Sequence, residues 1–188
     1  MRVIAGKLRG AKLFGPEEYE GTRPISDRAK EAMFSILQER TTGARFLDLF
    51  AGTGGVGIEA LSRHAAHATF VELHATPICL IRKNLLKTRF TDQAPVVRAD
   101  VFSFIAETKE VYDIIFVAPP QWQGLWHTSL EAIDHHTSIV SEKGVMILQC
   151  DPTEYHALPL RQIAEFDQRK YGGVLLTFFR VGGGCVSR

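Results

Sequence analysis

The sequence predicts an α/β fold built on a mostly parallel β-sheet, and three observations support this class. The chain has 188 residues, 45% of them hydrophobic, which is enough to bury one core. From Ala44 onward, short apolar runs alternate with segments of helical period, as in βαβ units. The first apolar run leads directly into a glycine-rich turn, the arrangement of sheets that bind nucleotides at the carboxyl ends of their strands.

The apolar runs define the expected strands, and the segments between them define the helices. The expected strands are residues 45–50, 69–72, 96–99, 112–117, 144–150 and 174–181, and the expected helices lie near residues 55–63, 77–87, 101–107 and 125–135. Thr76 is expected to cap the second of these helices, with Pro77 in its first turn. A short connection containing Pro159 precedes the last strand, so this strand is expected to be antiparallel and hairpin-like.

Residues 1–43 are expected to form an extension of the main domain, residues 44–188, without a core of their own. Residues 2–13 alternate apolar and basic side chains around Gly6 and Gly10, which predicts a short hairpin. Ser26 or Asp27 can cap a following helix. The apolar positions of that helix recur at helical spacing: Ala29, Ala32, Met33, Ile36 and Leu37.

Composition excludes several classes of protein. The net charge of +1 argues against binding nucleic acid by bulk charge alone, although residues 1–45 carry nine basic and six acidic side chains. Residues 1–12 carry four basic side chains and no acid, and this segment is either a phosphate-contacting arm or a solvated hairpin face. No signal peptide or membrane-spanning run is visible, which predicts a cytoplasmic protein. The three cysteines and seven histidines lack metal-ligand spacing, so neither a metal site nor a disulfide framework is expected. The cysteines are instead expected to be reduced and mostly buried.

The glycine turn is compatible with two kinds of cofactor. Gly52, Gly54 and Gly57 match G-x-G-x-x-G, and Glu72 follows Gly52 at the spacing of a dinucleotide-binding fold. Asp48, immediately before the turn, would repel a pyrophosphate but attract a cation. S-adenosylmethionine carries an ammonium and a sulfonium and no phosphate, so it is the favoured cofactor, and a nicotinamide oxidoreductase is the alternative.

Acidic residues end three successive expected strands. Glu72 can accept hydrogen bonds from both ribose hydroxyls, and Asp100 can reach the adenine amino group. Each of these acids, like Asp48, could instead cap local structure. The expected cofactor-binding residues are Asp48, Phe50, Ala51, Gly52, Thr53, Gly54, Glu72, Asp100 and Val101.

The fourth expected strand ends in Ala118-Pro119-Pro120-Gln121-Trp122. Two prolines make this turn rigid, and a rigid turn can hold backbone carbonyls toward an amino group. Methyl transfer to a base amine needs such acceptors, because they orient the nitrogen lone pair toward the methyl group, and an aromatic ring to stack the base. A simple surface turn is the alternative.

Several segments together closely resemble the RsmD-type methyltransferases: residues 2–10, 22–28 and 48–54, Asn84-Leu85 and residues 170–172. Enzymes of this family use S-adenosylmethionine to methylate the exocyclic amino group of a guanine in 16S ribosomal RNA. The resemblance implies a Rossmann-like class I methyltransferase with a seven-stranded sheet, an antiparallel last strand and an N-terminal extension that engages RNA. It also implies ribosomal RNA or a 30S assembly particle as partner, with Arg9, Lys12, Arg23 and Arg28 as candidate RNA contacts.

The sequence departs from the family at its (D/N)PP(Y/F) motif, where it has Ala118 and Gln121 around the two prolines. Loss of one orienting acceptor typically costs about 2.7 to 4 kcal/mol, or roughly 100- to 1000-fold in rate. One interpretation is that Gln121 supplies the acceptor oxygen while Trp122 or Trp126 stacks the base. Other interpretations are a different methyl acceptor, or a protein that binds cofactor or RNA without turnover. Retained transferase activity is favoured, with these expected catalytic residues: Ala118, Pro119, Pro120, Gln121 and Trp122.

Overall fold

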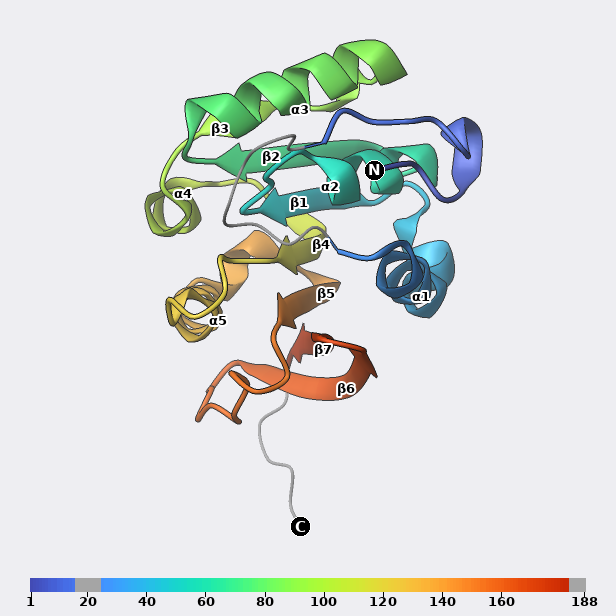
Figure 1. Ribbon diagram of the computed structural model, residues 1–188. Helices are drawn as coiled ribbons and strands as arrows, with labels where there is room; N and C mark the ends of the chain where they lie inside the picture. Colours follow the sequence, from blue (N-terminus) through green and yellow to red (C-terminus); the bar gives the residue numbers. More distant parts are fainter. Residues whose placement is uncertain (16–24, 183–188) are drawn as a thin grey trace.

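The computed structural model describes residues 1–15 and 25–182, which form one seven-stranded sheet flanked by helices (Figure 1). The strands are β1 (Arg45–Leu49), β2 (His67–Glu72), β3 (Val96–Arg98), β4 (Tyr112–Val117), β5 (Val140–Cys150), β6 (Ile163–Tyr171) and β7 (Val174–Val181). Their order is β3-β2-β1-β4-β5-β7-β6, and β7 runs antiparallel to both of its neighbours. The four strand pairs from β3 to β5 are parallel, as predicted.

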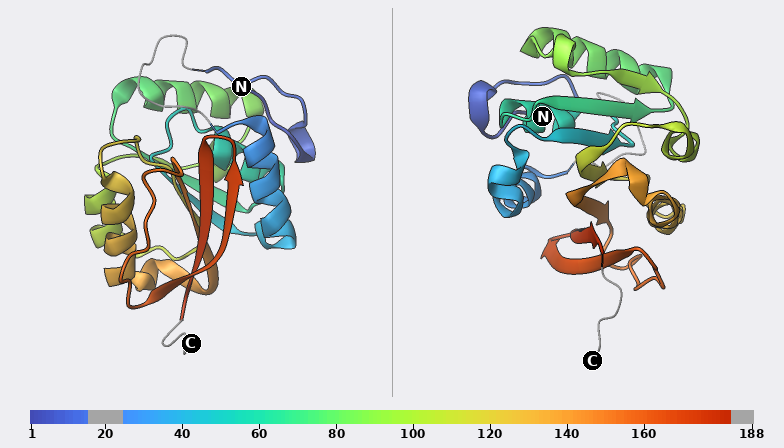
Figure 2. Two further views of the ribbon diagram at one scale, coloured as in Figure 1. Left: turned by 60° about the horizontal axis from the view of Figure 1, so that its bottom comes forward. Right: turned by 180° about the vertical axis from the view of Figure 1, so that it is seen from behind.

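The helices form layers on both faces of the sheet. They are α1 (Asp27–Leu37), α2 (Gly55–Ser62), α3 (Ala75–Thr88), α4 (Val101–Glu107) and α5 (Leu125–His135). Apolar side chains of α1, α2 and α3 form one hydrophobic cluster with the sheet, and those of α4 and α5 form the other. Figure 2 (left) shows the sheet between α1 on one side and α4 and α5 on the other. The predicted α/β class is therefore confirmed.

Three element predictions were incomplete or wrong. β6 was not predicted, and β5 begins at Val140 rather than at residue 144. β6 is an edge strand on which Ile163 is buried and most other side chains are not, so its sequence lacks an apolar alternation. Thr76 does not cap α3, because the helix begins at Ala75 and His74 occupies the capping position.

The N-terminal segment is not a regular hairpin. Arg2 and Lys12 pair as an isolated antiparallel bridge, the Val3 N–H is donated to the Ala11 carbonyl and the Leu13 N–H to the Met1 carbonyl, and a 3₁₀ turn, η1 (Gly6–Leu8), lies between the two arms. The reason is that several backbone N–H groups of this segment are donated to side chains of α2: Ile4 and Ala5 to Glu59, and Leu8 to Ser62. The two arms are therefore paired near their ends, and the residues between them are docked on α2.

The N-terminal residues share the core of the sheet. Val3 and Leu13 are buried in the same hydrophobic cluster as Met33 and Phe34 of α1 and Phe46 of β1. The Ser26 hydroxyl accepts a hydrogen bond from the Ala29 N–H at 3.2 Å and so caps α1, as one of the two predicted caps. No core separate from the sheet is found in this part of the described chain. The boundary at residue 43 stays a prediction.

Three further sequence expectations concern membranes, metals and thiols. Within residues 1–15 and 25–182, no helix is long and apolar enough to cross a bilayer. The same residues contain no group of three His, Cys, Asp or Glu side chains placed to hold a metal ion. Cys150 is buried as expected, and burial raises its pKa to about 12, but Cys79 is exposed. Cys185 lies outside the described residues.

Candidate active site

Two cavities meet at the carboxyl ends of the parallel strands, where β1 has β2 on one side and β4 on the other. This is the point of the sheet at which the strand order reverses, and such points bind ligands in open α/β sheets. The larger cavity has a volume of about 340 Å³ and the smaller one about 90 Å³. The two share Phe50, Gly52, Thr53, Ala118 and Pro120, so they form one continuous site.

The glycine turn shapes the floor of both cavities. Gly52 has φ of 54° and Gly54 has φ of 77°, and side chains disfavour this left-handed region. A Cβ atom on Gly52 would have only one neighbour within range, the Phe50 carbonyl oxygen at 4.0 Å, so it would project into open space. Glycine at this position therefore lets a ligand approach the backbone closely.

Asp48 lies beneath the glycine turn and lines the smaller cavity. Its carboxylate accepts the Gly57 N–H at 2.9 Å, and the residue is only 2% exposed. Burial raises the pKa of Asp48 to about 8, the Gly57 hydrogen bond opposes this shift, and the negative charge of Glu72 adds to it. A cationic ligand group in the smaller cavity would stabilise the ionised form.

Glu72 holds the glycine turn and still has capacity for a ligand. Its Oε1 accepts the N–H groups of Leu73 and His74, both at 2.9 Å, and its Oε2 accepts the Gly52 N–H at 3.0 Å. Because each carboxylate oxygen has about two acceptor positions, Oε2 keeps one for a ligand hydroxyl while Oε1 is fully used. The geometry thus favours one direct ribose hydrogen bond to Glu72 rather than two.

Asp100 caps α4, one of the two roles that the sequence left open, and its role as a cofactor ligand stays a prediction. Its Oδ1 accepts the N–H groups of Phe102 and Ser103 and so caps α4. Its Oδ2 accepts no hydrogen bond from the described residues, and the side chain lines the larger cavity together with Val101. An amino group of a ligand can therefore reach Oδ2, and Val101 contributes to the apolar wall.

The turn after β4 lies beside both cavities. Ala118 and Pro120 line the two of them, and Pro119 and Gln121 line the smaller one. The Pro119 carbonyl oxygen accepts no hydrogen bond from any described residue, so it is available as an acceptor. Ala118 itself offers only a methyl group at the position where the family motif has an acid or an amide.

The two tryptophans near this turn have different environments. Trp122 is 67% exposed, lines neither cavity, and donates its backbone N–H to Glu154. Trp126 is 4% exposed and packs against Tyr155 and His156, with ring centroids 5.3 and 4.9 Å away. The interpretation of Trp126 as a stacking ring is therefore wrong, because its ring is enclosed within the fold. Trp122 stays a prediction as the stacking residue.

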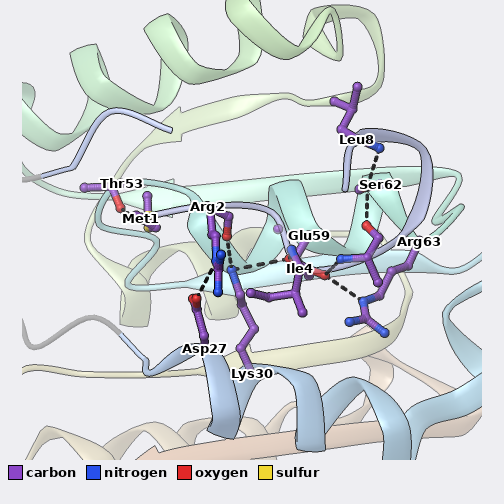
Figure 3. A network of polar contacts seen from close by, with 12 residues as sticks. Met1, Arg2, Ile4, Leu8, Asp27, Lys30, Thr53, Glu59, Ser62 and Arg63 are labelled. Atoms are coloured by element: carbon purple, nitrogen blue, oxygen red, sulfur yellow. Dashed lines mark hydrogen bonds and ion pairs between the residues drawn. The ribbon is translucent and has the colours of Figure 1, made fainter. Parts of the chain in front are cut away.

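Lys30 is a site residue that the sequence did not identify. It lines the smaller cavity and is 1% exposed, with Nζ 2.8 Å from the Arg2 carbonyl oxygen and 3.3 Å from the Glu59 carboxylate (Figure 3). Glu59 is also paired with Arg63 at 2.8 Å. Burial lowers the pKa of Lys30, and the Glu59 charge opposes this. The signal in the sequence that could have identified Lys30 was its position next to Ala29, on the apolar face of α1.

Gln149 is the second unpredicted site residue. It lines the smaller cavity from the end of β5 and is 8% exposed. Its side-chain oxygen is buried and has no hydrogen-bond partner in the described structure. In the sequence it only ends an apolar run, so no pattern marked it.

The candidate RNA contacts are at different distances from the site. Arg9, Lys12 and Arg28 are at least partly exposed, and Arg23 lies outside the described residues. Arg28 is in the first turn of α1, next to a segment that lines the smaller cavity through Ile25. Arg9 follows Leu8, which is bonded to the last residue of α2. Arg9 is therefore about 12 Å from the glycine turn, because this is the length of the eight-residue helix α2.

Solved structures identify the class of this fold. The yhhF protein from Escherichia coli is similar over 96% of this chain and 97% of its own, with a TM-score of 0.84 and 29% sequence identity. An RNA methyltransferase from Salinibacter ruber, solved with S-adenosyl-L-homocysteine, shares the fold at a TM-score of 0.67 and 13% identity, over 88% of this chain and 98% of its own. The fold and site define a class I methyltransferase that uses S-adenosylmethionine. This confirms the predicted fold, enzyme class and cofactor.

The chain belongs to the family described as Conserved hypothetical protein 95, whose sequence profile matches residues 1–180. A relative in this family is Ribosomal RNA small subunit methyltransferase D from Escherichia coli K12. It is 36% identical over 142 residues, which are 76% of this chain and 71% of the relative. The resemblance found in the sequence motifs is thus confirmed.

Proposed function

We propose that this enzyme methylates the exocyclic amino group, N2, of a guanine in small-subunit ribosomal RNA in the cytoplasm. The observation that carries the proposal is the junction of the two cavities at the turn after β4. A cofactor with its nucleoside in the larger cavity and its methionine portion beside Asp48 would meet, at this turn, a base that enters the smaller cavity from outside. The similarity to Ribosomal RNA small subunit methyltransferase D from Escherichia coli supports ribosomal RNA as the substrate class.

The residues of the larger cavity fit the cofactor, which supplies an electrophilic methyl group on a sulfonium when bound. Glu72 Oε2 accepts a hydrogen bond from a ribose hydroxyl, and Asp100 Oδ2 accepts one from the adenine amino group. Asp48 is adjacent, in the smaller cavity, where its carboxylate balances the positive charge of the methionine portion. Gly52 permits the close approach of the cofactor to the backbone.

The turn after β4 orients the methyl acceptor. The free Pro119 carbonyl accepts one N–H of the base amino group, which directs the nitrogen lone pair toward the methyl group. A base must leave its stack to enter this pocket, and Trp122 on the adjacent surface is the candidate ring to receive it. Arg9, Lys12, Arg23 and Arg28 are proposed to contact RNA phosphates.

A second candidate function is binding of cofactor or RNA without turnover. The observation in its favour is Ala118, which removes a side-chain acceptor that the family motif provides.

The test uses the full-length protein, radiolabelled S-adenosylmethionine, and 30S particles from a strain that lacks its own such enzyme. We expect label in 16S RNA, recovered as N2-methylguanosine after digestion, inhibited by S-adenosylhomocysteine and absent from 50S particles. Label on a different nucleoside would overturn the guanine assignment. No label on any RNA, with cofactor binding seen by calorimetry, would favour the second candidate.

A further inference from the structure

Gln149 is opposite the position of Ala118 when the register of β4 and β5 is extended by one residue beyond the end of β4. In the parallel pairing of β4 with β5, Phe116 is opposite Ile147 and Val117 is opposite Leu148, so the next two residues are neighbours. Successive side chains alternate between the faces of a sheet, and neighbouring strands are about 4.8 Å apart. Ala118 and Gln149 therefore project from the same face, the one that carries Phe116 and Ile147.

The environment of Gln149 has one feature that the fold alone does not explain. Its Oε1 atom is buried without a hydrogen-bond partner among the described residues, which destabilises the fold when no ligand or water satisfies it. The residue lines the smaller cavity, where the base is proposed to bind. A half-turn of the terminal amide exchanges its oxygen and nitrogen within the same space, so either can face the cavity.

The other buried polar side chains of the smaller cavity, Asp48 and Lys30, already have partners. Asp48 accepts the Gly57 N–H, and Lys30 donates to the Arg2 carbonyl and pairs with Glu59. Gln149 is thus the buried side chain of this cavity, within the described part of the chain, whose acceptor has no partner at all. Ala118 and Gln149 both line this cavity.

We propose that the side-chain oxygen of Gln149 accepts a hydrogen bond from the amino group that is methylated, in place of the acceptor that position 118 lacks. The assignment rests on the proposed function. A carboxamide also suits a base edge on which an amino group adjoins a ring nitrogen, because its N–H group donates to that nitrogen while its oxygen accepts. Guanine presents N2 and N3 in this way.

The experiment compares Gln149→Leu, Gln149→Glu and the double variant Gln149→Leu with Ala118→Asp, using 30S particles. Gln149→Leu should lower kcat by about 100-fold or more, since one orienting acceptor is lost. The cofactor Kd should stay within about twofold of wild type, and Tm should not fall, because leucine fills the space without an unpaired polar atom. Gln149→Glu keeps an acceptor and should retain more activity than Gln149→Leu.

The double variant should recover at least about tenfold of the lost kcat, because the carboxylate introduced by Ala118→Asp supplies an acceptor from the adjacent strand. Gln93→Leu, in a turn outside both cavities, is the matched control and should be unchanged. Wild-type kcat in Gln149→Leu would overturn the assignment. A further variant, Gln121→Leu, would also overturn it if this variant alone lost kcat while Gln149→Leu kept the wild-type value. So would a parallel fall of kcat, cofactor affinity and Tm, which would indicate a structural role. No label from wild type would instead overturn the proposed function itself.

Discussion

Asp48 is the residue whose chemistry differs most from the sequence-based expectation. The sequence predicted an acid at the lip of the cofactor pocket, whereas the structure buries it under the glycine turn and raises its pKa to about 8. At pH 7 most Asp48 carboxyls are therefore protonated before a cationic ligand arrives. Binding of a positive charge nearby favours the ionised form and lowers the pKa again.

We expect cofactor binding to release a proton from Asp48 below about pH 8, so that affinity for S-adenosylmethionine rises with pH up to about pH 8 and then levels. Calorimetry in two buffers with different ionisation enthalpies measures the number of protons released. Asp48→Asn should lose the proton release while its amide oxygen still accepts the Gly57 N–H. Equal proton counts for the two proteins would show that another group titrates.

The same carboxyl sets a pH dependence of stability. The pKa of Asp48 in the folded protein is above the ordinary value of 3.8. As pH rises, Asp48 therefore ionises in the unfolded chain before it ionises in the folded protein. The contribution of Asp48 to stability is therefore fully present below about pH 4 and is lost as pH rises through about 8. Asp48→Asn should accordingly gain stability relative to wild type as the pH is raised from 4 to about 8, which urea denaturation at the two pH values measures. A constant difference between the two proteins would show that Asp48 is ionised in the folded protein throughout this range.

At the scale of elements, Glu59 joins the N-terminal segment, α1 and α2 around one buried charge (Figure 3). Its carboxylate accepts the N–H groups of Ile4 and Ala5 at 2.7 and 3.0 Å and pairs with Lys30 and Arg63. Because α2 begins at the glycine turn, this network also fixes the floor of the site.

Replacing Glu59 with Gln should lower the free energy of unfolding by about 3 kcal/mol or more, because Lys30 is left buried without its counter-charge. Urea denaturation at pH 7 gives this value. The matched control is Asp27→Asn, which removes the exposed pair with Arg2 and should cost less than about 1 kcal/mol. Similar losses for the two variants would show that the buried charge is not the decisive feature.

Local patterns predicted the elements that bury an apolar face, and they failed where tertiary contacts decide. The parallel strands and the helices were predicted because their apolar residues recur with the right period. β6 was missed because it is a polar edge strand. The predicted N-terminal hairpin is paired only near its ends, because Glu59, far along the chain, accepts the N–H groups of Ile4 and Ala5. Gln149 was missed because its role depends on the register of β4 and β5.

For the whole molecule, the net charge of +1 means that RNA affinity must come from a local group of cations. Lys12 and the exposed Arg28 belong to the N-terminal segment and to the first turn of α1, whereas Arg9 lies about one helix length from the glycine turn. Comparing these positions therefore measures how far the RNA extends over the protein.

We expect Lys12→Ala and Arg28→Ala each to weaken RNA binding and to reduce the slope of log K against log salt by about 0.7 to 0.9, since each removes one phosphate contact. Fluorescence anisotropy at several salt concentrations measures the slope, and the cofactor Kd should not change. Lys109→Ala is the control. This exposed lysine precedes β4, so it lies at the amino-terminal end of the strands, opposite the end that carries the cavities. If Arg9→Ala changes the slope as much as Arg28→Ala, the RNA follows α2 over its full length. If only Arg28→Ala and Lys12→Ala do, it is confined to the region near the cavity. A slope unchanged in all three variants would remove the N-terminal segment from the RNA interface.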